Sequence, residues 1–147
     1  MKGFTLVELI IVLGIIILVS AMSLPFVSTF QVTSDLRTYN DGLAQAMRTA
    51  QFRAIDGYQG TNWGVYLDNA GKKYVIYSGN NYAARVTDSD LETGFNSAFS
   101  LSANFGNDIN FTIYNGLPSV NGTTTFTGTT DVTRYVTISS LGLIYGK

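Results

Sequence analysis

Glu8 is the side chain in this sequence whose position most needs a chemical explanation. It is the only charged residue between Gly3 and Ser34, and a long aliphatic run surrounds it. An isolated carboxylate in hydrocarbon is unfavourable, by about 2.5–3.5 kcal/mol at the centre of a membrane helix on insertion scales. A cationic partner offsets this penalty, and fixing the register between helices is the best-attested use of a buried ion pair. Glu8 therefore predicts ion pairing in an apolar environment.

The residue types on which most catalytic sites depend are missing. The chain has no histidine and no cysteine, which removes the commonest general base and the commonest metal ligand. No glycine-rich phosphate loop, zinc-ligand spacing or nucleophile elbow occurs. We therefore expect no enzyme activity, no catalytic residue, no cofactor and no metal site.

Charged side chains are few, and they give little sign of a ligand. The charged fraction is 13%, the net charge is −1, and no basic block indicates a nucleic-acid surface. Asp88, Asp90 and Glu92 alternate as calcium ligands can, but the glycine and closing glutamate of a calcium-binding loop are missing. We expect this acidic trio to lie in a solvated turn, and we expect no nucleic-acid partner.

The element that must position Glu8 is an apolar helix. The 21 residues from Phe4 to Leu24 are apolar or small except for Glu8 and three hydroxyl side chains. A helix of that length spans about 31 Å, close to the ~30 Å hydrocarbon core of a bilayer. Lys2 precedes it, so the positive-inside tendency predicts a cytoplasmic N-terminus. A secretory signal peptide, a plain single-span anchor and a buried core helix are the alternatives, and none of them gives the carboxylate a purpose.

Further helix is expected after Pro25. A proline inside a helix removes one backbone hydrogen bond and produces a kink or an opened turn; alternatively, Pro25 ends the membrane helix. A stripe of apolar and small residues then recurs at helical spacing. Gly57 is a plausible helix stop, so the helix should end near Ile55. The stripe consists of Leu36, Leu43, Met47, Ala50 and Ala54.

From Trp63 onward the pattern changes to that of β-strands. "WGVYLDNAGKKYVIYSG" predicts two strands joined by a turn, "YAARVT" a possible third, and the stretch from Asp88 to Gly106 a surface loop. "INFTIYNG" predicts a strand with Ile109, Phe111 and Ile113 on one face, and "TTTFTG" and "RYVTISSLGLIYG" supply closing strands, with a turn at Gly142. The expected fold is α+β: a long N-terminal helix packed on a C-terminal antiparallel β-sheet.

The order of residues at the N-terminus resembles a known family. "KGFTLVELII" is similar to the leader junction of type IV pilin precursors and of the pseudopilins of type II secretion. The resemblance implies cleavage after Gly3 by a membrane peptidase, N-methylation of the new N-terminal Phe4, and a role for Glu8 in assembly. Pilin helices characteristically carry a proline where Pro25 stands, so the implied fold is the pilin fold. It also implies a division into a leader (1–3), a hydrophobic membrane or filament-core helix (4–25), an amphipathic half (26–57) and a globular β-rich domain (58–147).

This resemblance gives Glu8 a partner. Cleavage after Gly3 removes Lys2 and leaves a cationic amine on Phe4, and each charge alone is unfavourable in hydrocarbon. When two subunits lie side by side, the Glu8 carboxylate of one can meet the Phe4 amine of the other. We therefore expect the pair to fix the axial register between subunits.

A second resemblance covers the rest of the chain. "AQAMRTAQFRAIDG" followed by "WGVYL", and the C-terminal "VTISSLGLI", are similar to the minor pseudopilin H family and its pilus-tip relatives. Some tip proteins of that group bind DNA through a basic tail, but only Lys147 is charged in "GLIYGK", so DNA binding is not expected. Without cysteine, the tail must be held by strand pairing.

The expected function is that of a structural subunit of a type IV pilus-like filament. The alternatives are a minor pseudopilin of a secretion or DNA-uptake machine and a membrane-anchored binding domain that never polymerises. The expected partners are further copies, other pilins or pseudopilins, the prepilin peptidase and methylase, an inner-membrane assembly platform, and lipid before assembly. Localisation is expected in the cytoplasmic membrane before assembly and in an extracellular filament afterwards.

Overall fold

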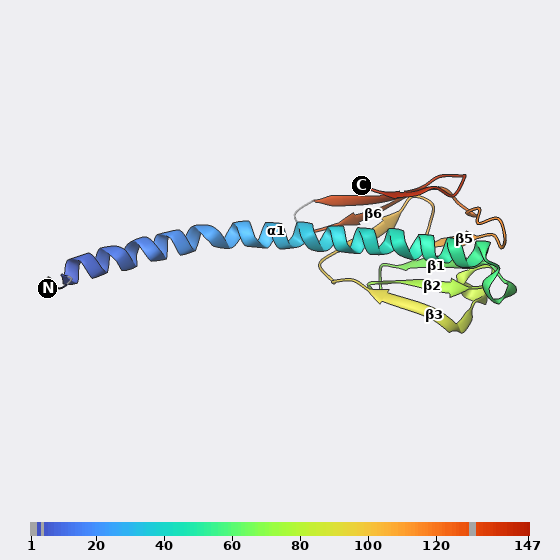
Figure 1. The fold of residues 1–147 in the computed structure, drawn as a ribbon, viewed down its shortest axis with the longest axis horizontal. Helices are drawn as coiled ribbons and strands as arrows, with labels where there is room; N and C mark the ends of the chain where they lie inside the picture. The colour runs from blue at the N-terminus through green and yellow to red at the C-terminus, as the bar shows by residue number, and fades with distance from the viewer. Residues whose placement is uncertain (1–2, 4, 130–131) are drawn as a thin grey trace.

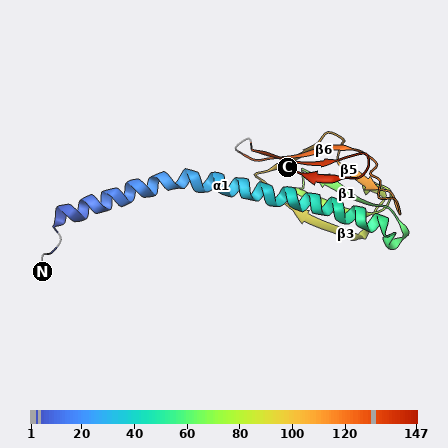
Figure 2. The same ribbon diagram turned by 45° about the horizontal axis from the view of Figure 1, so that its top comes forward.

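One long helix carries all of the β-structure at its C-terminal end. The structure is a computed structural model that describes residues 3, 5–129 and 132–147, without the side chains of residues 21–29. Helix α1 runs over Leu6–Ile55, and Figures 1 and 2 show about half of it projecting from the sheets as a gently curved rod. We call residues 6–30 the stem and residues 31–147 the head.

Local features of the chain explain where α1 begins and ends. Thr5 is extended, and its hydroxyl accepts a hydrogen bond from the Glu8 amide, as an N-cap does. At the other end Gly57 adopts φ 66°, a left-handed conformation that favours glycine and ends helices. The predicted end near Ile55 is confirmed.

The helix assignment continues without interruption through residue 25. The side chain of Pro25 lies outside the described residues. The kink predicted at that residue therefore stays a prediction.

The amphipathic stripe of the helix lies against the sheets, as predicted. Leu36, Leu43, Met47, Ala50 and Ala54 are all fully buried. Burial of this kind contributes about 25 cal/mol for each Å² of apolar surface removed from water. The part of α1 from Leu36 onward is therefore part of the core of the head.

The strands form two antiparallel sheets, which differs from the single sheet predicted. One sheet has the order β3-β2-β1-β5 and the other β4-β6-β7-β8, and α1 contacts strands of both. The chain leaves the first sheet after β3, because β4 pairs with β6 and not with β5. The strands are β1 (Trp63–Asp68), β2 (Lys73–Ser78), β3 (Val86–Gly94), β4 (Ser100–Ala103), β5 (Asp108–Phe111), β6 (Gly122–Thr127), β7 (Thr133–Ile138) and β8 (Ile144–Gly146), with short 3-10 helices η1 (Tyr58–Gly60) and η2 (Tyr82–Ala84).

The predicted loop from Asp88 to Gly106 was wrong, because it contains most of β3 and all of β4. "YAARVT" is also not one strand, since its first three residues form η2 and β3 begins at Val86. Strand β3 lies at the edge of its sheet, and its side chains are exposed or half-buried on both faces. Such a strand shows no alternation of apolar and polar residues, so the periodicity that reveals a half-buried strand is missing.

The acidic trio lies on this edge strand and not in a turn. Asp90 pairs with Arg85 at 2.7 Å, and Glu92 pairs with Lys73 at 2.7 Å. Acidic side chains on an exposed edge also discourage pairing with strands of other chains.

Strand β5 is shorter than predicted. Ile109 and Phe111 are fully buried as expected, but the strand ends at Phe111 and Ile113 is only half-buried. Tyr114 follows with φ 64°, and its amide donates to the Ala54 carbonyl at the end of α1. The helix terminus therefore turns the chain away from the sheet.

A buried polar cluster joins β2 to β5. The Tyr77 hydroxyl donates to Asp108 Oδ1 at 2.5 Å and accepts from Asn110 Nδ2 at 3.2 Å. Asp108 Oδ2 also accepts from the Tyr82 amide at 3.0 Å. Burial, together with the bond to Asp108, raises the pKa of Tyr77 well above its ordinary value.

Candidate assembly site

The predicted assembly residue lies in the first turn of α1. Glu8 is exposed, and its amide donates to Thr5 Oγ1 at 3.3 Å. Thr5 and Glu8 stand three residues apart, the spacing of a capping box, in which the helix start is stabilised by both side chains. Thr5 was missed as a functional residue, although the T-x-x-E pattern before an apolar run was a usable signal.

Among the described residues of one chain, Glu8 has no cationic partner. The ion pairs in the part of the chain that the structure describes are Lys73–Glu92 and Arg85–Asp90. Gly3 is exposed, and Phe4, the predicted methylation site, lies outside the described residues. In the part of the chain that the structure describes, no cation competes with an incoming partner for the Glu8 carboxylate.

Exposed aliphatic side chains surround Glu8 on the stem. Their exposed fractions range from 48% to 76%, whereas a monomeric soluble protein rarely exposes a contiguous apolar patch above a few hundred Å². The stem is therefore an interaction surface. It includes Leu6, Val7, Leu9, Ile10, Ile11, Val12, Leu13, Ile15, Ile16, Ile17, Leu18 and Val19.

Among the described residues, no helix combines the length and the apolar character needed to cross a membrane. Phe4 and the side chains of residues 21–25, which belong to the predicted span 4–25, lie outside the described residues.

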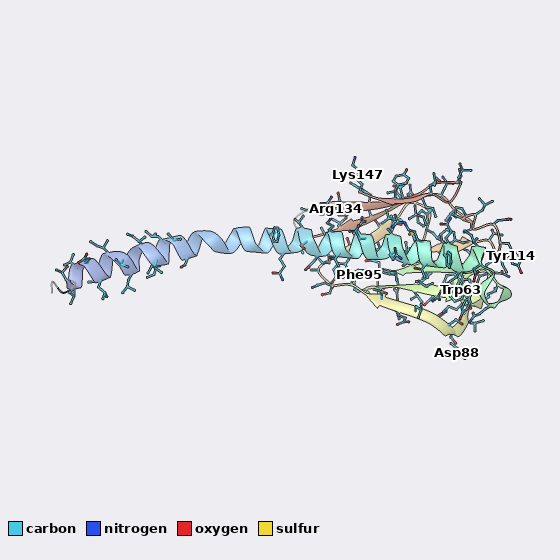
Figure 3. The ribbon with its side chains drawn as sticks, viewed as in Figure 1. Trp63, Asp88, Phe95, Tyr114, Arg134 and Lys147 are labelled. Atoms are coloured by element: carbon cyan, nitrogen blue, oxygen red, sulfur yellow. The ribbon has the colours of Figure 1, made fainter. Side chains whose placement is uncertain are left out.

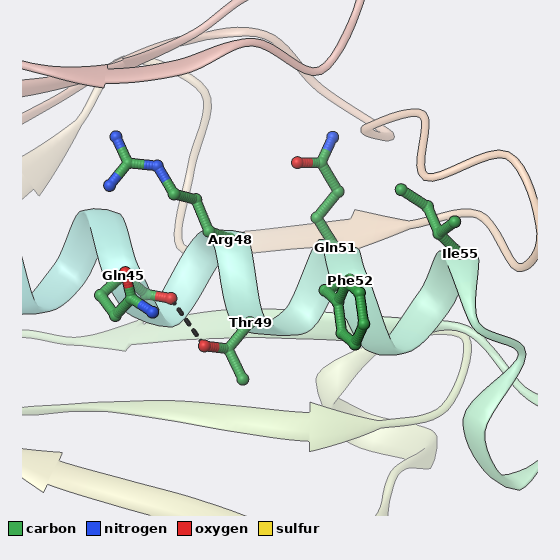
Figure 4. A pocket seen from close by; sticks show the side chains of 6 residues that line it. All are labelled: Gln45, Arg48, Thr49, Gln51, Phe52 and Ile55. Atoms are coloured by element: carbon green, nitrogen blue, oxygen red, sulfur yellow. Dashed lines mark hydrogen bonds between the residues drawn. The ribbon is translucent and has the colours of Figure 1, made fainter.

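A second exposed surface lies at the C-terminal end of α1. Six residues line an open groove of about 440 Å³ on the outer side of the helix (Figure 4). Phe52 and Ile55 are 68% and 48% exposed there. The sequence did not predict this groove, because only the buried stripe of the helix has a recognisable period. The lining residues are Gln45, Arg48, Thr49, Gln51, Phe52 and Ile55.

Side chains on one wall of the groove fix the helix to the C-terminal segments. Gln51 Nε2 donates to the carbonyls of Gly116 and Gly142 at 3.0 and 2.9 Å. Arg48 Nη2 donates to the Ile144 carbonyl at 3.0 Å. In Figure 4 Arg48 and Gln51 point to the side on which these segments lie. The groove is therefore held in a fixed shape by contacts that do not involve Phe52.

Acidic side chains do not gather into a metal site in the described part of the chain: no three His, Cys, Asp or Glu residues stand close enough to share an ion.

The arrangement of an extended helix on two small sheets has a counterpart among solved structures. The minor pseudopilin EpsH from the type 2 secretion system of Vibrio cholerae is similar over 77% of this chain and 96% of its own, with a TM-score of 0.61. The chain has a pseudopilin-like fold. Sequence identity is 13%, so the likeness is one of fold. No protein-family model and no curated protein matches the sequence.

In this pseudopilin-like fold the head and the stem are separate parts of the molecule. The head encloses the core, and the N-terminal part of α1 extends away from it (Figure 1). Glu8 lies in the first turn of this helix. The predicted α+β class and the packing of a long helix on antiparallel strands are confirmed.

Proposed function

We propose that this chain is a structural subunit of a type IV pilus-like filament, processed after Gly3 and polymerised through its stem. The observation that carries the proposal is the exposed aliphatic surface of the stem, with one carboxylate in its first turn. An apolar rod of this kind needs lipid or other rods around it. Exchange of lipid for neighbouring stems costs little, because a helix bundle and a bilayer are similarly apolar.

In this proposal Glu8 selects the position of the neighbouring subunit. The carboxylate and the Phe4 amine lie four residues apart, so a neighbour displaced by about 6 Å along the helix axis brings one beside the other. The helix dipole disfavours a cationic amine at the N-terminus of α1, and the neighbour's carboxylate offsets that cost. A repeated displacement in one direction produces an open helical polymer.

A second candidate function is that of a minor pseudopilin in a secretion or DNA-uptake machine. Its support is the likeness in fold to EpsH, which is a minor pseudopilin of a type 2 secretion system. In both roles the chain acts by assembly with other pilins or pseudopilins and catalyses no reaction. A membrane platform and a prepilin peptidase would act on it before assembly.

The experiment is to isolate surface filaments and the membrane fraction and to measure the N-terminus and the copy number of the chain by mass spectrometry. We expect a mature chain that begins at methylated Phe4 in the filaments. Many copies per filament identify a main subunit, whereas one or a few identify a minor component. An intact Met1 found in the membrane fraction alone contradicts the proposal and favours a non-polymerising binding domain.

A further inference from the structure

A polar hollow lies between α1 and the C-terminal strands. Its volume is about 330 Å³. Figure 3 shows Arg134 and Lys147 on the same side of α1, toward the end of the head that faces the stem. Neither the stem nor the groove near Phe52 shares a residue with it. The hollow is lined by Arg37, Asn40, Asp41, Arg134, Gly146 and Lys147.

Cationic side chains predominate in this hollow. The side chains of Arg37, Arg134 and Lys147 outnumber the one acidic side chain, Asp41, and the α-carboxylate of Lys147 in the printed sequence is a second negative group. The described part of the chain contains two ion pairs, Lys73–Glu92 and Arg85–Asp90, so none of the three cations is in an ion pair there. A concentration of unpaired cations in a concave site attracts anions from solution.

Two buried polar atoms in the hollow lack partners. Arg134 Nε is buried and has no acceptor, and Asn40, which is only 2% exposed, has no donor to its Oδ1 atom. An unsatisfied buried polar group is costly, and more so when it belongs to a charged side chain. A ligand that offers an anionic oxygen to Arg134 and an O–H or N–H to Asn40 satisfies both.

The backbone of β8 approaches α1 closely at the wall of the hollow. A Cβ atom at Gly146 would lie 3.0 Å from Asn40 Nδ2, so glycine permits this close approach. A smaller hollow of about 180 Å³ adjoins it, because Arg37 and Arg134 line both, and there the 70% exposed ring of Phe30 stands beside the two guanidinium groups.

We propose that this hollow binds an oxyanion, a carboxylate or phosphate group, between Arg37 and Arg134. A guanidinium is a planar fork of N–H donors that matches the geometry of either group. Hydrogen phosphate offers the kinds of group that both unsatisfied atoms lack, since it carries anionic oxygens and an O–H. Acetate offers anionic oxygens alone, so we expect it to bind more weakly.

The position of the hollow favours an oxyanion from solution over a lipid headgroup. If residues 4–25 span the membrane, Arg37 lies twelve residues further along the helix, or about 18 Å. The headgroup layer is about 5–8 Å thick on each side. Both sources offer the same chemistry, and a comparison of membranes distinguishes them.

The test is a titration of the full-length chain in detergent micelles with inorganic phosphate or acetate against chloride at equal ionic strength, followed by amide NMR shifts. We expect saturable phosphate binding, with shifts around Asn40 and Arg134. Arg134→Gln should weaken it about tenfold, the usual effect of losing a hydrogen bond to a charged group. Arg37→Gln should also weaken it, and the head should remain folded because the Arg37 side chain is exposed.

Lys73→Gln is the matched control, because it removes a positive charge on β2, away from the hollow. Absence of saturable phosphate binding, or equal weakening by Lys73→Gln, overturns the proposal. In nanodiscs, loss of phosphate binding on anionic lipid but not on zwitterionic lipid supports the site with a headgroup as its occupant. This inference is independent of filament assembly, so either proposal can fail alone.

Discussion

At the scale of single residues, Glu8 has two distinct physical roles, one in helix capping and one in ion pairing. As the third residue after the N-cap Thr5, it occupies the position of the capping-box acid at the start of α1. As the only charge between Gly3 and Ser34, it is also the one group on the stem able to pair with an amine. The first role needs only an acceptor at this position, whereas the second needs a negative charge.

Glu8→Gln separates these roles, because glutamine keeps the capping-box acceptor and removes the charge. We expect filament yield to fall about tenfold or more, the effect of about 1.4 kcal/mol or more per contact, while the head remains folded. Filaments are counted by electron microscopy, and circular dichroism follows the fold. Thr5→Ala is the matched control: it removes the cap at a cost of about 0.5–2 kcal/mol but keeps the charge. Equal losses in both variants would show that Glu8 acts through helix capping.

Tyr77 controls the alkaline stability of the head. Its pKa in the folded head is raised, first by burial and then by the bond to Asp108. The stability that the neutral hydroxyl contributes is therefore complete below the ordinary tyrosine pKa of about 10 and is lost as the pH rises above it. Burial also raises the pKa of Tyr74. Denaturant unfolding should show a free energy that falls above about pH 10.

Tyr77→Phe should flatten this alkaline fall. It should also reduce the free energy of unfolding at neutral pH by about 1–3 kcal/mol, because Asp108 and Asn110 lose a buried partner. Tyr114→Phe serves as the control, since Tyr114 is 70% exposed. An unchanged pH dependence in Tyr77→Phe would show that other groups cause the fall.

At the scale of elements, the sequence predicts helices and strands whose apolar residues recur at a regular spacing, and it misses those without such a pattern. The buried stripe from Leu36 to Ala54 and the hairpin of β1 and β2 were predictable, because one face is buried and the turn residues are distinctive. Strand β3 was missed because its side chains are exposed, and the separation into two sheets depends on long-range pairing of β4 with β6. The groove at Phe52 was missed for a related reason, since exposed residues leave no periodic signal.

Truncation of a side chain to alanine should have different effects on the two faces of α1. Met47→Ala removes a fully buried side chain and should reduce the free energy of unfolding by about 2–5 kcal/mol. Phe52→Ala removes a 68% exposed ring and should change stability by no more than about 0.5 kcal/mol. Denaturant unfolding measures both. A large loss of stability in Phe52→Ala would show that the groove belongs to the core and is not a free surface.

At the scale of the whole molecule, the head contains the folded core and the stem presents the apolar surface. All buried residues of the described chain lie from Leu36 onward, so the described side chains of the stem contribute nothing to the core. The stem can therefore exchange lipid for neighbouring stems without disturbing the head. The residues able to pair across subunits are concentrated near its tip, while the head presents the polar surface.

Removal of residues 1–29 should leave the head folded. We expect a free energy of unfolding within about 0.5 kcal/mol of that of the full-length chain in micelles, because the described side chains among the removed residues are exposed and outside the core. Chemical denaturation of both forms tests this. A head that unfolds without the stem would show that the two parts are one cooperative unit.

Cryo-electron microscopy of filaments containing this chain tests the pairing of Glu8 most directly. The density should place the Glu8 carboxylate within ion-pair distance, about 4 Å, of the Phe4 amine of an adjacent subunit. It should also show the two helices displaced by about 6 Å along their axes. A Glu8 side chain that faces no amine, in filaments that are otherwise ordered, would contradict the role proposed for it.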